Sequence, residues 1–233
     1  MVKAADLWNS DDSAITWSHG QASVSGPHRV PTGFFYSKPI AVPQPTGPAV
    51  RGTESHRVFS VAEFERHLHV VVASGPCQGA CGEQDADTND LFFWFDIDTA
   101  TMALHQKAKV VHPGLGFVFP TLAVDARGNV VMAATGGSRE QPPSIYLASH
   151  RREDPLNAVN GPSLAYAGTS SYVCPNPDLQ RREGDVVGWG TYSATVQDGS
   201  DPTKIWTVQE YGGSDNPCEW KTRVLGMQTA SLR

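Results

Sequence analysis

Two segments of this 233-residue chain repeat one pattern of strand, turn and strand. The segment "FPTLAVDARGNVVMAAT" aligns with "TYSATVQDGSDPTKIWTVQ", and the first strand of each is expected to end at an aspartate, Asp125 or Asp198. A weaker copy, "HRVFSVAEFERHLHVVVAS", precedes them with its turn at Glu65-Arg66. The two aspartates lie 73 residues apart, which is room for about four strands and matches a β-propeller blade with long outer loops.

Helical periodicity is almost absent along the whole chain, whereas short β-branched or alternating runs bounded by turn residues recur. This pattern predicts an all-β fold. The predicted strands cover residues 13–18, 20–25, 57–64, 67–74, 91–98, 102–111, 121–126, 129–135, 144–151, 163–168, 192–198, 204–211 and 220–231.

The repeat divides the chain into three predicted propeller blades, at about 54–112, 113–185 and 186–233. Residues 1–53 precede them as a strand pair and an extended linker, "PIAVPQPTGP", that completes a blade. Because half a ring exposes apolar blade faces and strand edges, we expect a twofold homodimer that closes six or seven blades. The alternative is that the chain is a fragment of a longer polypeptide.

The composition argues against two classes of partner. The net charge is −6 and only 18% of residues are charged, so nucleic acid and anionic membranes are not expected to bind. The apolar runs are too short to span a membrane, and the start "MVKAADLWNSDDS" lacks the apolar stretch of an intact signal peptide.

All four cysteines fall in predicted loops. The simplest pairing is a local Cys77–Cys81 bridge and a long-range Cys174–Cys218 bridge, which would place the protein in an oxidising compartment. A zinc site is the competing interpretation, although the paired CxxC spacing typical of zinc is missing, and free thiols remain a third.

The order "HRVFSV", "FPTLAVDARGNVVMAATGGS", "PSIYLASHRRED" and "WGTYSATVQDGSDPTKIWTVQEY" resembles the C-terminal half of a family of bacterial secreted β-propeller proteins. That family usually carries Arg-Trp-Gly-Asp-Tyr-Ser, an Asp-Pro turn and Trp-x-x-x-Glu-Tyr. The resemblance covers about residues 40–226 and implies a propeller with an extracellular or periplasmic location. The function of the family is largely undefined.

The chain departs from the family pattern where the innermost strands open. Gly188 replaces the Arg before Trp, Thr191 replaces the Asp of Gly-Asp-Tyr-Ser, Gly199 replaces the turn Pro, and Ser55 stands where an Asp is usual. Any role of those charges near the central channel therefore does not transfer to this chain.

Polar residues at the predicted strand starts would line a channel mouth, where propellers bind ligands. Glu54 and His56 could hold a divalent metal, while Tyr192 and Ser193 could donate hydrogen bonds to an oxyanion and Arg57 completes the predicted catalytic set. The alternative is that these groups are solvated rim residues or satisfy backbone groups at strand ends.

The "HLH" segment places His67 and His69 on one face of a strand, where they could chelate one zinc and leave room for a third ligand and a water. No third ligand can be named from the sequence. Two histidines packed between blades would give the same alternation.

Oxygen ligands at the spacing of a calcium loop occur in "DADTNDLFFWFD", which supplies Asp85, Asp87, Asn89 and Asp96. The central glycine of such a loop is missing, and a polar turn before a strong strand explains the same residues.

Two functions follow from these features. The first is a metal-assisted hydrolase of small esters or phosphoesters with its site in the channel and zinc as the expected metal, calcium being the alternative. The second is a non-catalytic extracellular binding or scaffold module that recognises a glycan or a protein through Trp8, Trp17, Trp189 and Trp220. No Gly-x-Ser-x-Gly elbow, phosphate-binding loop or dinucleotide fingerprint occurs.

Overall fold

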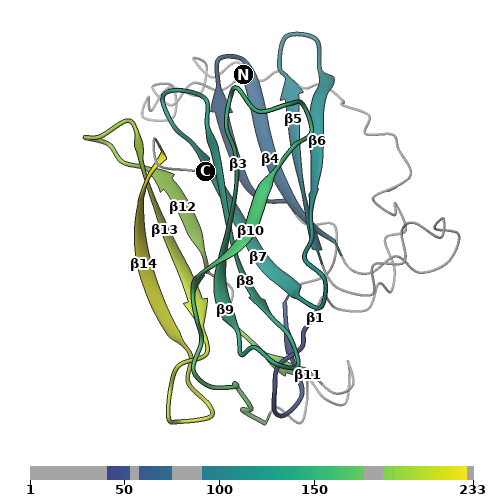
Figure 1. Cartoon of the computed structure of the whole chain (residues 1–233), viewed down its shortest axis with the longest axis vertical. Helices are drawn as coiled ribbons and strands as arrows, with labels where there is room; N and C mark the ends of the chain where they lie inside the picture. Colours follow the sequence, from purple (N-terminus) through teal and green to yellow (C-terminus); the bar gives the residue numbers. More distant parts are fainter. Residues whose placement is uncertain (1–40, 53–57, 75–90, 176–185, 191, 230–233) are drawn as a thin grey trace, which may run out of the picture.

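The computed structural model describes residues 41–52, 58–74, 91–175, 186–190 and 192–229. In this part of the chain the fold is all-β, with fourteen strands in four sheets (Figure 1). The predicted fold class is confirmed at the level of all-β architecture with four-stranded antiparallel sheets. The predicted strands at 13–18 and 20–25 lie outside the described residues.

The first four-stranded sheet contains consecutive antiparallel strands in the order β3-β4-β5-β6. Its strands are β3 (Val58–Phe64), β4 (His67–Ser74), β5 (Leu91–Asp98) and β6 (Ala103–Val110). Glu65 and Arg66 join β3 to β4 with positive φ angles of 46° and 68°, the combination that a tight primed hairpin turn requires. The turn predicted at this pair is confirmed.

The second four-stranded sheet lies at the centre of the molecule and is ordered β10-β9-β8-β7. Its strands are β7 (Gly116–Val124), β8 (Val130–Gly137), β9 (Ser144–His150) and β10 (Asn160–Tyr166). Every residue of β7 and β8 is buried, whereas β10 is largely exposed. The sheet is therefore covered on both faces at its β7 edge and open to solvent at its β10 edge.

Two smaller sheets complete the described fold. The third sheet is antiparallel and consists of β12 (Ala194–Gln197), β13 (Lys204–Tyr211) and β14 (Lys221–Gln228). The fourth consists of β1 (Ala41–Val42), β2 (Ala49–Arg51) and β11 (Val186–Gly188), with β11 parallel to β2.

The segment expected to be an extended linker carries the two-residue strand β1. Val42 of β1 and Val50 of β2 are fully buried and pair directly across the small sheet. Two or three apolar residues among prolines are too few to give a periodic signal, so their burial by other strands could not be predicted.

The aspartates that defined the repeat occupy equivalent turns. Asp125 follows β7 and accepts backbone N–H groups of Arg127 and Asn129, while Asp198 follows β12 and accepts those of Ser200 and Asp201. Such side-chain to backbone bonds stabilise tight turns and explain why the sequence repeats there. Hydrogen bonds from Ser200 and Trp206 hold the pKa of Asp198 well below its ordinary value.

Two strands begin earlier than the sequence predicted. Each contains a proline, and the predicted strand began only after that proline. Strand β7 begins at Gly116 rather than 121, and its register shifts between Val118 and Thr121, around Pro120. Strand β10 begins at Asn160 rather than 163, with a shift around Pro162. Proline lacks the N–H that a ladder needs and is tolerated at a bulge, so a prediction that ends strands at proline truncates both.

The main core fills the space between the two four-stranded sheets. It includes Trp94 and Phe92 from the first sheet and Phe117, Leu122 and Met132 from the second, all nearly inaccessible to solvent. Phe92 and Phe117 meet edge to face with ring centroids 5.9 Å apart.

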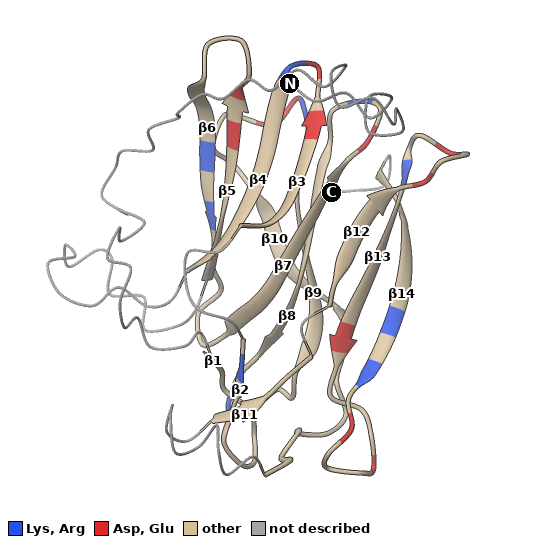
Figure 2. Ribbon diagram, turned by 180° about the vertical axis from the view of Figure 1, so that it is seen from behind, with Lys and Arg blue, Asp and Glu red and all other residues tan. Residues whose placement is uncertain are grey.

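The first strands of three sheets lie next to one another. Ser60 of β3 donates to the carbonyl of Leu122 in β7, and Thr121 of β7 shares a 2.6 Å hydrogen bond with Thr195 of β12. Strand β7 therefore lies between β3 and β12, and Figure 2 shows the three in the middle of the molecule, with charged residues sparse and mostly near strand ends.

A disulfide joins Cys174 to Cys218, as predicted, and ties the segment after β10 to the segment before β14. Val173 donates its N–H to the carbonyl of Pro217 beside the bridge. The predicted Cys77–Cys81 bridge lies outside the described residues. No helix in the described part is long and apolar enough to cross a membrane.

Replacing both Cys174 and Cys218 with serine should lower the free energy of unfolding. The two cysteines are 44 residues apart, and a loop of that size corresponds to about 4 kcal/mol in the chain-entropy account of disulfide stabilisation. Urea unfolding of the double variant without reductant measures the loss. An unchanged urea midpoint would show that the two segments are held together without the bridge.

Candidate metal-binding site

Strand alternation places His67 and His69 of β4 on the same face of the first sheet, as predicted. Their rings are stacked with centroids 6.4 Å apart. Asp96 of β5 pairs directly with His69 across the sheet, so its side chain emerges on that face as well. This is also the face that packs Trp94 against the second sheet.

A bulge in β6 adds another histidine to this face. Asp96 pairs with Gln106 but the next residue, Ile97, pairs with Leu104, which leaves His105 as the extra residue. Two residues of a bulged strand oppose one residue of its partner, so both His105 and Gln106 are directed toward Asp96. The His105 ring meets the ring of His67 edge to face, with centroids 4.9 Å apart.

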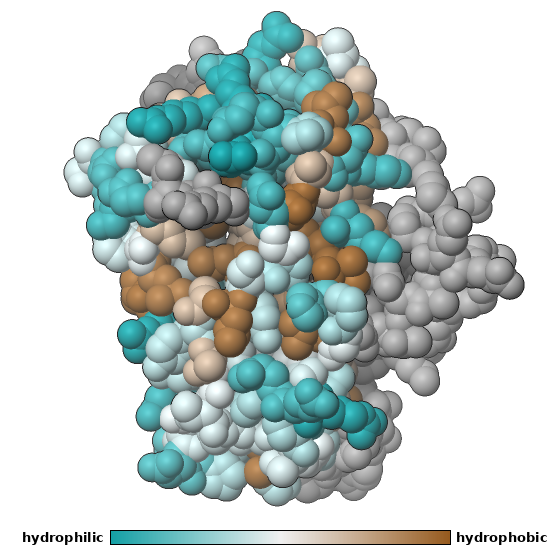
Figure 3. Space-filling view, in the orientation of Figure 1, coloured by the Kyte–Doolittle hydropathy of each residue, from teal (hydrophilic) through white to brown (hydrophobic). Residues whose placement is uncertain are grey.

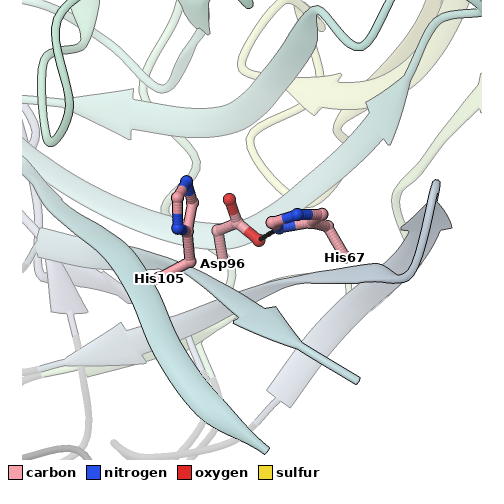
Figure 4. Close-up of side chains that lie close together, drawn as sticks. All are labelled: His67, Asp96 and His105. Carbon is pink, nitrogen blue, oxygen red and sulfur yellow. Dashed lines mark hydrogen bonds and ion pairs between the residues drawn. The ribbon is translucent and has the colours of Figure 1, made fainter. Parts of the chain in front are cut away.

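His67, Asp96 and His105 together form a candidate metal-binding group. Each offers one ligand atom, and these atoms all lie within 4.8 Å of one another. Figure 4 shows Asp96 between the two imidazole rings. The Asp96 side chain is 3% exposed, that of His67 is 31% exposed, and His105 lies at the surface. The group thus has a buried carboxylate at its base and an open side.

Hydrogen bonds fix the buried carboxylate. Asp96 Oδ1 accepts from His67 Nδ1 at 2.7 Å, and Oδ2 accepts from the Gln106 amide at 3.1 Å. The Gln106 carbonyl oxygen in turn accepts the backbone N–H of Asn157 from the loop between β9 and β10. The second sheet therefore helps to orient Asp96 through Gln106.

Behind this group lies a buried layer of His69, Trp94 and His150. Trp94 donates its indole N–H to His69 Nδ1 at 3.3 Å, and the two rings are stacked at 11°. On the other side Trp94 contacts His150, with centroids 4.7 Å apart. His150 Nδ1 lies 2.7 Å from the Ala158 carbonyl and must donate, because a carbonyl oxygen only accepts.

The buried layer keeps His69 neutral. Burial lowers the pKa of His69 to about 4; the Asp96 carboxylate opposes this, and the neighbouring histidines His67, His150 and His105 lower it further. A neutral imidazole that already accepts from Trp94 has a structural role in this arrangement, so His69 lies near the candidate metal group without belonging to it.

The group thus differs from the predicted pair, because only His67 of the two predicted histidines belongs to it, and Asp96 and His105 are its other two members. The position of His105 in the sequence did not predict its place in the group, because His105 enters the group through a bulge. A bulge cannot be recognised from the alternation of apolar and polar residues. Asp96, expected in a calcium loop, lies inside β5 and hydrogen-bonds to His67. Asp85, Asp87 and Asn89, the other residues of that loop, lie outside the described residues.

The residues predicted at the channel mouth do not join this group in the described part of the chain. Tyr192 and Ser193 precede β12 of the third sheet, whereas His67 opens β4 of the first. Tyr192 is 86% exposed and Ser193 is half-buried. Glu54, His56 and Arg57, together with Trp8 and Trp17, lie outside the described residues.

Comparison with known proteins gives distant structural likenesses. No family model and no curated protein matches the chain. The solved structures that match include a subtype N11 neuraminidase-like protein of A/flat-faced bat/Peru at 10% identity and TM-score 0.35, over 76% of this chain and 62% of that one. Another has 14% identity and TM-score 0.32, over 83% of this chain and 57% of that one. It is described under the GH130 family of mannoside phosphorylases, which contains glycoside hydrolases that target beta-1,2 mannosidic linkages in Candida mannan.

A third, of unknown function and from Dyadobacter fermentans, has 12% identity and TM-score 0.28, over 76% of this chain and 53% of that one. This chain therefore spans between half and two thirds of the length of each of these structures.

The buried His69 should make the protein sensitive to acid. Its pKa is about 6.5 in the unfolded chain and about 4 in the folded protein, so its contribution to stability is complete above 6.5 and is lost as the pH falls toward 4. The loss should be on the order of 2 to 3 kcal/mol. Urea unfolding of the wild type and of His69→Gln from pH 7 to pH 4 measures it.

The difference in free energy of unfolding between the wild type and His69→Gln should therefore change by about 2 to 3 kcal/mol between pH 7 and pH 4. The exposed His112, which lies outside this cluster, provides the matched control as His112→Gln. Equal pH slopes for the wild type and His69→Gln would contradict a buried neutral imidazole at this position.

Proposed function

We propose that this protein is a metal-assisted hydrolase of small esters or phosphoesters, with a divalent metal bound by His67, Asp96 and His105. The observation that carries the proposal is the convergence of two imidazoles and one carboxylate from three strands, with ligand atoms within 4.8 Å. Three protein ligands and one open position are typical of catalytic zinc sites.

The donor set favours zinc over calcium. Two of the three donors are imidazole nitrogens, which suit zinc, whereas calcium takes six to eight oxygens. Ligand atoms around a tetrahedral zinc are about 3.4 Å apart, given bonds of about 2.1 Å. The ion would replace the proton between His67 and Asp96, widening their 2.7 Å contact, and the exposed His105 would close in to complete the group.

The open side of the group is where substrate would bind. A zinc-bound water has a pKa near 7, so hydroxide is present at neutral pH. Bound zinc would thus supply the nucleophile for ester or phosphoester hydrolysis, and His67, Asp96 and His105 would hold the ion beside the open side of the group. Arg66 precedes His67 on the exposed turn between β3 and β4, and in the described part of the chain its guanidinium contacts Asp98 at 3.6 Å. From this turn it could approach an anionic phosphoester.

For the architecture we propose a half β-propeller that is secreted and pairs with a second copy. The proposed blades cover about residues 54–112, 113–185 and 186–233. Their support is the two four-stranded antiparallel meanders and the first strands β3, β7 and β12, which lie side by side. The disulfide between Cys174 and Cys218 supports an oxidising compartment.

Metal binding tests the site directly. Calorimetric titration of metal-free protein with zinc should give one zinc per chain, and His105→Gln and Asp96→Asn should each weaken binding about tenfold or more. His112→Gln, which alters an exposed histidine outside the group, is the matched control. A wild type without stoichiometric zinc, or variants that bind as tightly as the wild type, would contradict the site.

Hydrolysis by the zinc-loaded protein tests the reaction. Activity on para-nitrophenyl acetate or on bis(para-nitrophenyl) phosphate should require zinc and fall in His105→Gln in proportion to occupancy. Zinc binding with no hydrolysis of either compound would leave a structural metal site and overturn the enzyme.

The dimer is tested by its exposed apolar side chains. Val61 of β3 and Val196 of β12 are at least half exposed on strands that would face the channel. Sedimentation should show a dimer for the wild type and a monomer for the Val61→Lys/Val196→Lys variant. Leu156, equally exposed in the loop before β10, provides the control as Leu156→Lys. A well-folded wild-type monomer would rule out the paired half rings.

A further inference from the structure

A second cluster of functional groups lies beside the disulfide, where Trp189 follows β11 of the fourth sheet. Tyr172, Trp189 and Trp220 contact one another, with ring centroids between 5.3 and 5.8 Å apart. The bridge between Cys174 and Cys218 joins the segments that carry Tyr172 and Trp220. Covalent linkage of these segments holds the aromatic rings together over Trp189.

Glu210 of β13 belongs to the same cluster. Its side chain is buried, with the whole residue 5% exposed, and its carboxyl lies directly against Gly190. A Cβ at position 190 would collide with both carboxylate oxygens, which accounts for the glycine after Trp189. The "WGTYS" segment is therefore shaped around a buried acid.

Two polar atoms of this cluster have no hydrogen-bond partner in the described part of the chain. They are Glu210 Oε2 and Trp189 Nε1, and both are buried; Ser193 Oγ, also buried and unsatisfied, lies one residue before Ala194, which pairs with Val208 of β13. An unsatisfied buried polar group destabilises the folded state, and folded proteins seldom leave such groups without a role. The unsatisfied atoms of Glu210 and Trp189, with that of Ser193 on the adjoining segment, indicate that a ligand completes their hydrogen bonding.

The protonation of Glu210 fits an uncharged ligand. Burial raises the pKa of Glu210 to about 7, against hydrogen bonds from the Trp220 side chain and the Tyr192 backbone that lower it. Near neutral pH the carboxyl therefore donates as well as accepts, as ligand hydroxyls require. An anionic ligand would bring a second negative charge next to this acid.

The outer side of the cluster presents aromatic surface to solvent. Trp220 is 38% exposed and Tyr192 is 86% exposed, although both lie next to the buried acid. The brown band across the middle of Figure 3 marks strongly hydrophobic residues and does not locate these two rings, because tryptophan and tyrosine rank as slightly hydrophilic on that hydropathy scale. Exposed aromatic rings above buried polar groups are a common arrangement for amphipathic ligands.

We propose that Glu210, Ser193, Trp189 and Trp220 form a binding site for a neutral polyhydroxylated ligand, a sugar ring. The apolar C–H face of the ring stacks on Trp220, and the ring hydroxyls complete the hydrogen bonding of Glu210 and Ser193. The exposed Trp220 side chain shifts onto the sugar as the hydroxyls reach the carboxyl. This site is independent of the metal group and carries no catalytic role.

The test uses neutral sugars on the full chain in the presence of a metal chelator, so that the result is separate from zinc binding. Methyl α-glucopyranoside and methyl β-galactopyranoside are titrated with tryptophan fluorescence and calorimetry as readouts, and glucuronic acid is the charged comparison. The wild type should bind at least one neutral sugar saturably and glucuronic acid more weakly.

The variants locate the site. Trp220→Ala and Glu210→Leu should each weaken binding by about tenfold or more, because each removes a stacking surface or a hydrogen-bonding group. Glu210→Gln keeps the hydrogen bonds and should stay within a few-fold of the wild type. Trp206→Phe changes a tryptophan beside the Asp198 turn, at the other end of β13, and should leave binding unchanged.

Absence of saturable binding of either neutral sugar to the wild type would overturn the proposal. Binding that Trp220→Ala leaves unchanged would overturn the location. If Glu210→Leu does not fold, as judged by near-ultraviolet circular dichroism, Trp220→Ala and Glu210→Gln decide the outcome without it.

Discussion

The complete burial of β7 is the constraint on which the described fold depends. All nine residues of this strand are buried, and it contacts β8 in its own sheet, β3 on one side and β12 on the other. A strand covered on every side has to fill space with side chains such as Phe117 and Leu122 and satisfy its backbone at the same time. The bulge around Phe119 and Pro120 makes this feasible, because it places a residue that cannot donate where the ladder is already interrupted.

Both candidate sites lie near strand ends, where buried polar residues replace the apolar residues of the core. The interface between the first and second sheets is apolar around Trp94 and becomes polar toward the hairpin ends, where His69, Asp96 and His150 are buried. The third sheet contributes a buried acid, Glu210, at the end of β13. Because neighbouring elements remove water from these groups, each needs a partner or a shifted pKa. The strands that build the core therefore also hold these buried titratable groups at its edge.

The strands could be predicted from alternation and turn residues, but the sites could not. Strands β4, β5 and β13 have the predicted bounds, since their apolar periods are strong and their turns are polar. His105 and Gln106 reach Asp96 through a bulge, and Glu210 meets Gly190 and Trp220 through contacts that loops and a disulfide set up. His67 was found because a strand face follows from sequence spacing, whereas its partners depend on register, which spacing alone does not give.

Two buried groups shift the stability in opposite directions with pH. The folded protein binds a proton less readily at His69 than the unfolded chain does, so acid favours unfolding through this residue. Glu210 behaves in the opposite way, because its pKa of about 7 in the folded protein exceeds its ordinary value of 4.5, and its contribution is present below 4.5 and lost as the pH rises through 7. The two ranges overlap between 4.5 and 6.5, where a gain through one group offsets a loss through the other. The free energy of unfolding therefore changes less with pH in that range than either residue alone would dictate, and removing one of them exposes the slope of the other.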